Sequence, residues 1–228
     1  MRSLFRTSDP IVRNALALAA AAFVVGISFG AIASAAGIPL VKVAAMSVFV
    51  YAGGAQFLAV GILSAGGGTL AIVLAGLLLN ARHLPFGLAI GDVLDGPVAK
   101  RVVGSHLLID ESVAFALAES DPAARKRAYW LVGGMLFVTW NLASIAGALA
   151  GAAMGDPSQF GVDAAFPAGL LALLTPSLRE RPGLRVALGA AALALLATPF
   201  LPAGLPVLVA LVGVAFALPV PMRKAVSE

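Results

Sequence analysis

Long apolar runs dominate this chain and restrict the folds that it can adopt. Runs such as 14–36 and 69–91 reach about 20 residues, the length that a helix needs to cross the hydrocarbon core of a bilayer. Only 11% of the 228 residues are charged, whereas a soluble domain carries about 25%. The strict two-residue alternation of membrane barrel strands is absent. The sequence therefore predicts an all-α, polytopic membrane protein, with residues 1–228 forming a single integral membrane domain in contact with lipid.

Loops rich in glycine, proline and charge divide the chain into eight apolar segments. In order, they cover residues 14–36, 41–63, 69–91, 102–118, 128–154, 163–178, 184–200 and 203–220. Two segments are expected to be interrupted helices, because Gly53-Gly54 divides 41–63 and Pro167 divides 163–178. A membrane helix is broken only where protein or water satisfies the freed backbone groups, so both breaks predict a lined cavity.

Arginine and lysine collect in the termini and in a subset of the loops, which sets the expected orientation. The basic stretches on one side are 2–13, 125–127, 179–185 and 223–224. The positive-inside rule then places both termini in the cytoplasm of a bacterial inner-membrane protein and requires an even number of crossings. Eight full crossings place Lys100-Arg101 outside, against the rule. Six crossings place it inside if 41–63 is a re-entrant hairpin and 102–118 stays within the bundle; the sequence leaves both schemes open.

The two halves of the chain, 14–119 and 128–220, share a faint likeness that we interpret as an inverted repeat. Each half has a first apolar segment, a Gly/Pro loop and an interrupted second segment. Paired interrupted helices at corresponding positions indicate the substrate site of a transporter. Close helix packing through glycine is the alternative explanation of the same pattern.

A run of small residues with one amide marks the first candidate site. Gly53, Gly54 and the alanines beside them allow a backbone or a ligand to approach closely, and Gln56 adds two donors and two acceptor lone pairs. We predict that these three residues bind the backbone groups of a zwitterion, with Pro167 contributing from the second interrupted segment. The alternative is a helix-packing groove in which Gln56 bonds to another helix.

Polar residues at the centre of an apolar segment form the second candidate site. Asn80, Arg82 and His83 lie about halfway along 69–91, where a central Arg costs roughly +2.5 to +3.5 kcal/mol of insertion free energy. Such a residue normally faces a protein interior or a wet cavity, which predicts a solute pathway. The guanidinium of Arg82 matches a substrate carboxylate, and His83 relays protons or only packs. The alternative for Arg82 is an internal ion pair with Asp92, Asp110 or Glu111.

Two acids and a histidine in segment 102–118 form the third candidate site. His106 and Asp110 are four residues apart, which places them on one face of a continuous helix. Adjacent carboxylates in an apolar helix repel each other, so one of them tends to hold a proton. We predict that Asp110 or Glu111 couples transport to protons, with His83 or His106 adjusting its proton affinity. The alternative is that this short segment lies at the membrane surface with its acids solvated.

Other classes of function lack support in the residues. The net charge of +4 resides in loops and termini without a basic helix interleaved with aromatics, so nucleic-acid binding is not expected. The absence of cysteine and the presence of two histidines leave no predicted metal site or cofactor. No nucleotide-binding loop, metalloprotease helix or nucleophile elbow occurs, so we expect no enzyme; an intramembrane hydrolase is the weak alternative. Ala31-Ile32-Ala33 resembles a signal-peptidase site, but the apolar run before it is longer than a usual signal core.

Six short motifs occur in one order along residues 15–220. They are Ser28-Phe29-Gly30 with Gly37, Met46-Ser47, Tyr51 to Phe57, Asn80 to Pro85, Asp110-Glu111-Ser112, and Asp163 with Ala165 to Ala168. Together they resemble the AzlC family (YgaZ type) of branched-chain amino acid export proteins. Pro85-Phe86 departs from the family pattern, in which a bulkier aromatic pair is expected, and this departure bears on substrate choice.

The resemblance implies a function and a partner that the residues alone do not establish. It implies export of valine, leucine or isoleucine, coupled to the proton gradient. It also implies a separate, small AzlD-type membrane subunit as partner. Two alternatives stay open: a passive channel or facilitator whose flux ignores the proton gradient, and a scaffold subunit that binds the partner but no amino acid.

Overall fold

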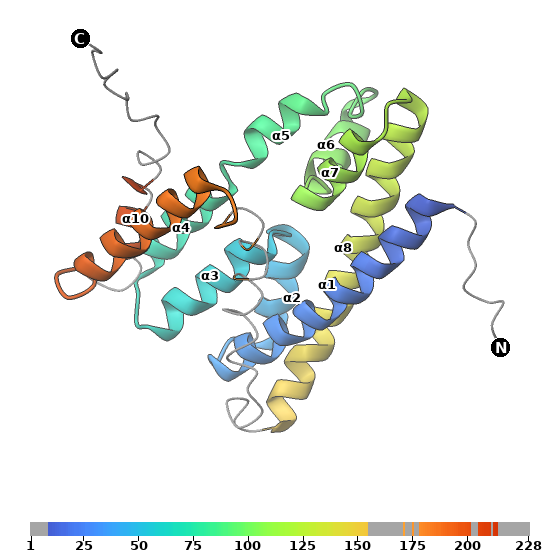
Figure 1. Ribbon diagram of the computed structural model, residues 1–228. Coiled ribbons are helices and arrows are strands. Elements are labelled where there is room, and N and C mark those ends of the chain that lie inside the picture. Colours follow the sequence, from blue (N-terminus) through green and yellow to red (C-terminus); the bar gives the residue numbers. More distant parts are fainter. Residues whose placement is uncertain are drawn as a thin grey trace, which may run out of the picture.

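The computed structural model describes residues 9–154, 171, 175, 178–201, 205–210 and 212–213 (Figure 1). Its helices are α1 (Pro10–Ala35), α2 (Leu40–Phe49), α3 (Gly53–Ser64), α4 (Thr69–Asn80), α5 (His83–Ala89), α6 (Val98–His106), α7 (Asp110–Ala118), α8 (Pro122–Met154), α10 (Arg181–Ala197) and α11 (Leu205–Ala210). Within these residues, Pro10–Ala35, Thr69–Ala89 and Pro122–Ala153 are long and apolar enough to cross a membrane. The predicted helical membrane fold is confirmed. Pro167 and the break expected there lie outside the described residues.

Helices α1 and α8 pack side by side and run in the same direction (Figure 1). Arg127, near the start of α8, bonds Asp9 at the start of α1, with 2.6 Å between Nη2 and Oδ2. Two glycines on each helix, spaced by four residues, bring the backbones together. They are Gly26 and Gly30 on α1 and Gly147 and Gly151 on α8. This pair makes α1 an integral part of the bundle. We call the end where both helices begin the Asp9 end, and the opposite end the Pro39 end.

The parallel course of α1 and α8 bears on the internal repeat. These are the first helices of the two proposed halves, and an inverted repeat would run them in opposite directions. For this pair the inverted relation does not hold, since Gly26 lies beside Ala143 and Gly151 lies beside Ala31. The repeat of 14–119 and 128–220 stays a prediction, because much of the second half lies outside the described residues.

The ion pair at the Asp9 end has a defined pH dependence. The hydrogen bond from Arg127 holds the pKa of Asp9 below its ordinary value of 3.8. The carboxylate also caps α1, accepting from the N–H of Ile11 at 2.9 Å. Because the folded-state pKa is depressed, the contribution of Asp9 to stability is present above pH 3.8 and is lost as pH falls through the lowered pKa.

We therefore expect Asp9→Asn to flatten the acid side of the stability profile. The difference in melting temperature between wild type and variant in detergent should shrink as pH falls below about 4. The effect should be small, because the carboxylate is screened by solvent. A difference that grows on acidification would contradict this assignment.

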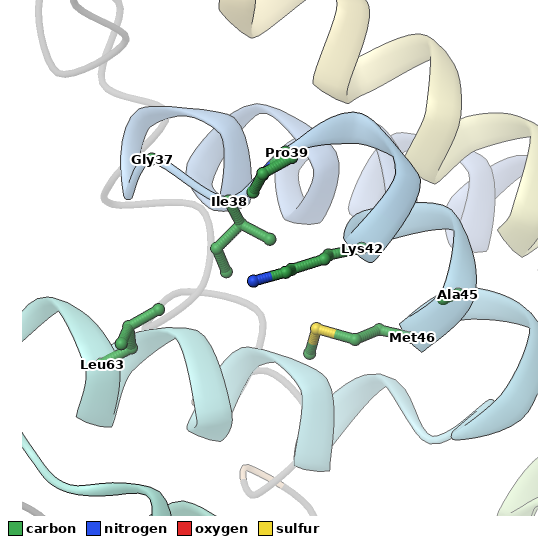
Figure 2. A pocket seen from close by; sticks show the side chains of 7 residues that line it. All are labelled: Gly37, Ile38, Pro39, Lys42, Ala45, Met46 and Leu63. Carbon is green, nitrogen blue, oxygen red and sulfur yellow. The ribbon is translucent and has the colours of Figure 1, made fainter.

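Helices α2 and α3 form a hairpin that enters the bundle from the Pro39 end. The chain turns at Gly37, where φ is 77°, and α2 then runs inward. Figure 2 shows that Lys42, near the start of α2, lines one pocket with Leu63, near the end of α3. Both outer ends therefore lie at the same end of the bundle. With a rise of about 1.5 Å per residue, each arm is roughly 15–18 Å long, about half the thickness of a bilayer core.

The tip of this hairpin is a short break rather than a smooth turn. Tyr51 adopts a φ of 35°, which non-glycine residues rarely occupy. Its hydroxyl donates to the carbonyl of Gly133 at 3.3 Å, and its ring meets that of Phe137 at 5.0 Å. The tip is thus held against the middle of α8. The predicted interruption is confirmed, and α3 begins at Gly53 itself.

Helices α6 and α7 form a second hairpin, which enters from the Asp9 end. Lys100, in the first turn of α6, lies 5.8 Å from the ring of Trp130 near the start of α8. Deeper in the bundle, the Tyr129 hydroxyl donates to the Gly104 carbonyl at 2.7 Å. At the tip, the Ser112 hydroxyl donates to the Leu107 carbonyl at 3.1 Å. Helix α7 then returns antiparallel to α8, with Ala116 and Tyr129 in one apolar cluster.

These two hairpins decide between the crossing schemes for the first 154 residues. The segments 41–63 and 102–118 each return to the end where they began, as the six-crossing scheme requires. Lys100-Arg101 therefore lies at the Asp9 end together with Arg125 and Arg127. Arg125 fastens the intervening loop there, 3.7 Å from Asp92 and 2.7 Å from the Ala89 carbonyl.

Candidate functional site

An ion pair joins the third crossing helix to the tip of the second hairpin. Arg82 lies in the break between α4 and α5, and Asp110 is the first residue of α7. Their side chains meet with 3.0 Å between Nη1 and Oδ2, and remain 39% and 43% exposed. The internal ion pair that the sequence left open is therefore formed, and its acid is Asp110. It lies between the ends of the crossing helix, where lipid would not solvate charge.

The start of α3 faces the same guanidinium. A Cβ added to Gly54 would lie 3.8 Å from Arg82 Nη2 and 3.5 Å from the Leu79 side chain. No side chain caps α3, whose N-cap residue is Ala52. The first N–H groups of a helix carry partial positive charge and point at whatever lies before them. The Arg82 head group and this helix start together favour an anion between them.

A second carboxylate and a histidine lie within electrostatic range of the ion pair. Glu111 is half-buried and interacts with Asp110, Arg82 and His83. His83 Nδ1 lies 2.9 Å from the Asn80 carbonyl. Because a carbonyl only accepts, Nδ1 carries a proton in this contact. The cluster therefore contains two carboxyl groups, one imidazole and one guanidinium.

Gln56 is a buried polar residue of α3, two positions after Gly54. It is fully buried, and its Oε1 accepts from Trp140 Nε1 at 2.7 Å. Its Nε2 has no hydrogen-bond partner among the described residues. Trp140 in turn stacks on Phe29 of α1, with ring centroids 5.9 Å apart. The amide oxygen thus packs α3 against α8, as the helix-packing interpretation of Gln56 expects. Substrate binding by Gln56 stays a prediction.

Two pockets lie elsewhere on the bundle. Figure 2 shows the pocket at the Pro39 end. The other has a volume of about 560 Å³ and is lined by Val48, Phe49, Val102, Val103, His106, Leu107, Gly134, Phe137 and Val138. Neither includes Arg82, Asp110 or Glu111. The Arg82 and Asp110 side chains are partly exposed in the described chain.

Comparison with known proteins assigns the chain to a family. A family model described as AzlC protein matches residues 17–154, more than half of the chain. The chain belongs to the AzlC family. This is a family associated with membrane transport. The matched stretch contains every candidate residue named above except Pro167.

Two relatives of this AzlC-family chain are membrane proteins of Helicobacter pylori. A protein named "Uncharacterized membrane protein" from strain ATCC 700392 / 26695 is 27% identical over 136 residues, covering 59% of this chain and 60% of the relative. A protein of the same name from strain J99 / ATCC 700824 is 28% identical over 123 residues, covering 49% and 54%. The chain thus spans less than two thirds of the length of these relatives. No solved structure matches it.

In the AzlC-family chain, part of the predicted site comes together, and not every residue lies as expected. Arg82, Asp110 and Glu111 form one cluster with His83, and Gly54 borders it. The prediction that His106 and Asp110 share one helix face is wrong, because α6 ends at His106 and α7 begins at Asp110. The intervening turn directs the two side chains to different partners. Pro167 lies outside the described residues.

His106 links the two hairpin tips instead. Its Nε2 donates to the Val48 carbonyl at 2.7 Å, and its ring lies 6.0 Å from that of Tyr51. Val48 is in the last turn of α2, where carbonyls lack intrahelical partners. A side chain at the α6–α7 tip therefore supplies the hydrogen bond that a carbonyl near the α2–α3 tip lacks.

Three contributors to this site were missed in the sequence. Tyr51 holds the α2–α3 tip, Ser112 closes the α6–α7 tip, and Trp140 binds Gln56. Tyr51 and Ser112 belong to motifs quoted above that also contain candidate site residues, so these motifs could have indicated them. Trp140 lies in none of those motifs.

Removing the His106 donor should loosen the hairpin contact. We expect His106→Phe to reduce stability by about 1–2 kcal/mol, because the Val48 carbonyl loses its donor. His106→Gln, which retains an N–H donor, should recover part of the loss. Thermal unfolding of both variants in detergent measures the difference. Equal melting temperatures for wild type and His106→Phe would show that the bond contributes nothing.

Proposed function

We propose that this protein is a secondary transporter subunit that exports branched-chain or other hydrophobic amino acids, coupled to protons, together with a small AzlD-type subunit. It would reside in a bacterial inner membrane with both termini, and hence the Asp9 end, in the cytoplasm. The observation that carries the proposal is the Arg82–Asp110 pair beside the uncapped start of α3. The AzlC-family membership supports it.

In this proposal the substrate carboxylate binds between Arg82 and the start of α3. Guanidinium geometry suits a carboxylate, and the free N–H groups around Gly53 and Gly54 add donors without a side chain in the way. The unused Nε2 of Gln56 and the amide of Asn80 are further polar groups for the substrate backbone. We retain Pro167 as a predicted contributor from the second half.

The acids supply the coupling. The α-ammonium of the substrate binds the carboxylates of Asp110 and Glu111, and a proton competes for the same oxygens. A proton on either acid weakens ammonium binding, so the site binds a proton or a substrate but not both. Inward movement of a proton is then exchanged for outward movement of a substrate. His83 passes the proton between this cluster and water, and His106 adjusts the fit by holding the two tips together.

Counterflow in proteoliposomes tests this proposal. The protein, reconstituted with and without the AzlD-type subunit, is loaded with unlabelled leucine and offered labelled amino acids across an imposed pH step. We expect saturable exchange of leucine, isoleucine and valine that rises with the pH step. Flux that ignores the pH step would indicate a passive facilitator, and no flux with a stable complex would indicate a scaffold.

A further inference from the structure

The pocket at the Pro39 end contains a charge that the proposed transport mechanism does not use. Lys42 is the only charged residue between Arg13 and Arg82. It lies in the first turn of α2 and is exposed. Lys42 forms no ion pair with any residue that the structure describes. Within the described chain, its ammonium is therefore free to bind an anion.

Apart from this ammonium, the pocket is apolar. It has a volume of about 380 Å³. Its other lining residues are Gly37, Ile38, Pro39, Ala45, Met46 and Leu63. Figure 2 shows the Lys42 ammonium extending into the space between α2 and α3. None of these lining side chains carries a carboxyl, amide or hydroxyl group. The pocket thus combines one positive charge with a hydrocarbon surface.

The charge lies at the outer end of the pocket, and the hydrocarbon surface extends inward from it. Side chains on a helix tilt towards its N-terminus, so the Lys42 ammonium lies near Ile38 and before the first turn of α2 (Figure 2). Ala45 and Met46 are three and four residues further along α2, on the same helix face as Lys42 and about 5 Å deeper. Leu63, near the end of α3, forms the opposite wall.

An anionic phospholipid matches both features of this pocket. Its phosphate accepts hydrogen bonds from an ammonium, and its acyl chain covers an apolar surface. A hydrophobic amino acid matches only in part, because its α-ammonium would lie beside Lys42 without an acceptor among the lining side chains. A zwitterionic phospholipid brings a cation of its own. A headgroup with net negative charge is therefore favoured.

We propose that the pocket between α2 and α3 binds one anionic phospholipid, with the phosphate against the Lys42 ammonium and one acyl chain along Ala45, Met46 and Leu63. The lipid fills the space between the two arms of the hairpin at the Pro39 end. This site is separate from the Arg82 cluster and does not depend on the proposed transport.

Site-directed fluorescence quenching tests the lipid preference of this pocket. The chain has no cysteine, so Leu63→Cys places a single bimane fluorophore on the full chain. The labelled protein is reconstituted into vesicles that contain phosphatidylglycerol or phosphatidylcholine with a nitroxide on the acyl chain. The matched control is Leu70→Cys in the first turn of α4, which lies at the same end and is 72% exposed.

We expect phosphatidylglycerol to quench the fluorophore at position 63 about fivefold more effectively than phosphatidylcholine, which is the preference that one lysine near a membrane surface provides. The two lipids should quench equally at position 70. Lys42→Gln should lower the ratio at position 63 to the ratio at position 70, whereas Lys42→Arg should retain it. Added salt should lower the wild-type ratio without any substitution at Lys42.

Three outcomes would overturn the lipid site. The first is an equal ratio at positions 63 and 70 in the chain that retains Lys42. The second is a preference for phosphatidylglycerol that persists in Lys42→Gln, in a chain whose thermal unfolding matches the wild type. The third is the absence of quenching by either lipid at position 63, which would show that protein rather than lipid covers the pocket.

Discussion

Replacing Arg82 with alanine should lower leucine counterflow at least about 30-fold. Truncating one partner of a hydrogen-bonded charge pair costs about 2–5 kcal/mol of binding free energy, and each 1.4 kcal/mol is about a factor of ten. Arg82 is the cation that the substrate carboxylate would meet at the start of α3. Arg82→Lys should retain part of the activity, because an ammonium keeps the charge but loses the planar fork.

The same substitution also leaves Asp110 without its partner, so a structural effect must be separated from a functional one. The double variant Arg82→Ala/Asp110→Asn removes both charges and should restore insertion and melting temperature. In our proposal it still fails to exchange leucine. Wild-type counterflow in the double variant would reduce Arg82 to a partner for Asp110 and remove it from substrate binding.

Adding one methyl group between α1 and α8 should be the most destabilising small change in the chain. A Cβ on Gly30 would collide with the Ser144 carbonyl, and one on Gly147 with the Ile27 carbonyl. Both obstacles are backbone, which cannot rotate away as a side chain can. Overpacking a core typically costs about 1–3 kcal/mol, and we expect Gly30→Ala and Gly147→Ala to reach or exceed about 3 kcal/mol because two helix backbones must separate.

Gly76→Ala on α4 is the matched control. A Cβ there meets nothing within 4 Å, so the change should be neutral or slightly stabilising through higher helix propensity. Unfolding in mixed micelles by increasing sodium dodecyl sulfate measures all three variants on one scale. If Gly147→Ala unfolds at the same fraction of sodium dodecyl sulfate as Gly76→Ala, the close contact of α1 and α8 is not present in the protein.

Much of the candidate site was predictable because polar residues in lipid are few and conspicuous. Arg82, Asp110 and Glu111 stand out in apolar segments, and the ion pair among them was one of the predicted alternatives. The break before Gly53 was also predictable, since paired glycines weaken a membrane helix. These inferences depend on local composition, which reports the solvent around each segment.

Two further breaks differ in how far local composition predicts them. Helix α4 ends at Asn80, shortly before Pro85, which has no N–H to bond the Ala81 carbonyl. Helix α6 ends at His106 without a proline or paired glycines at the interruption. The second break is stabilised by Ser112, which bonds the Leu107 and Ile109 carbonyls at 3.1 and 2.9 Å. Because this contact forms only once α7 folds back, the sequence suggested one continuous helix and a false shared face for His106 and Asp110.

By itself, the sequence determined that the solvent of this protein is lipid, that its secondary structure is helical, and which few side chains are ionisable inside it. These follow from the composition of each segment, because hydrocarbon accepts neither unpaired backbone groups nor isolated charge. The tertiary structure alone decided that two segments turn back halfway, that α1 and α8 run parallel, and that Asp110 is the acid that pairs with Arg82. Those features depend on contacts between segments far apart along the chain, where a side chain of one element forms a hydrogen bond with a backbone group of another.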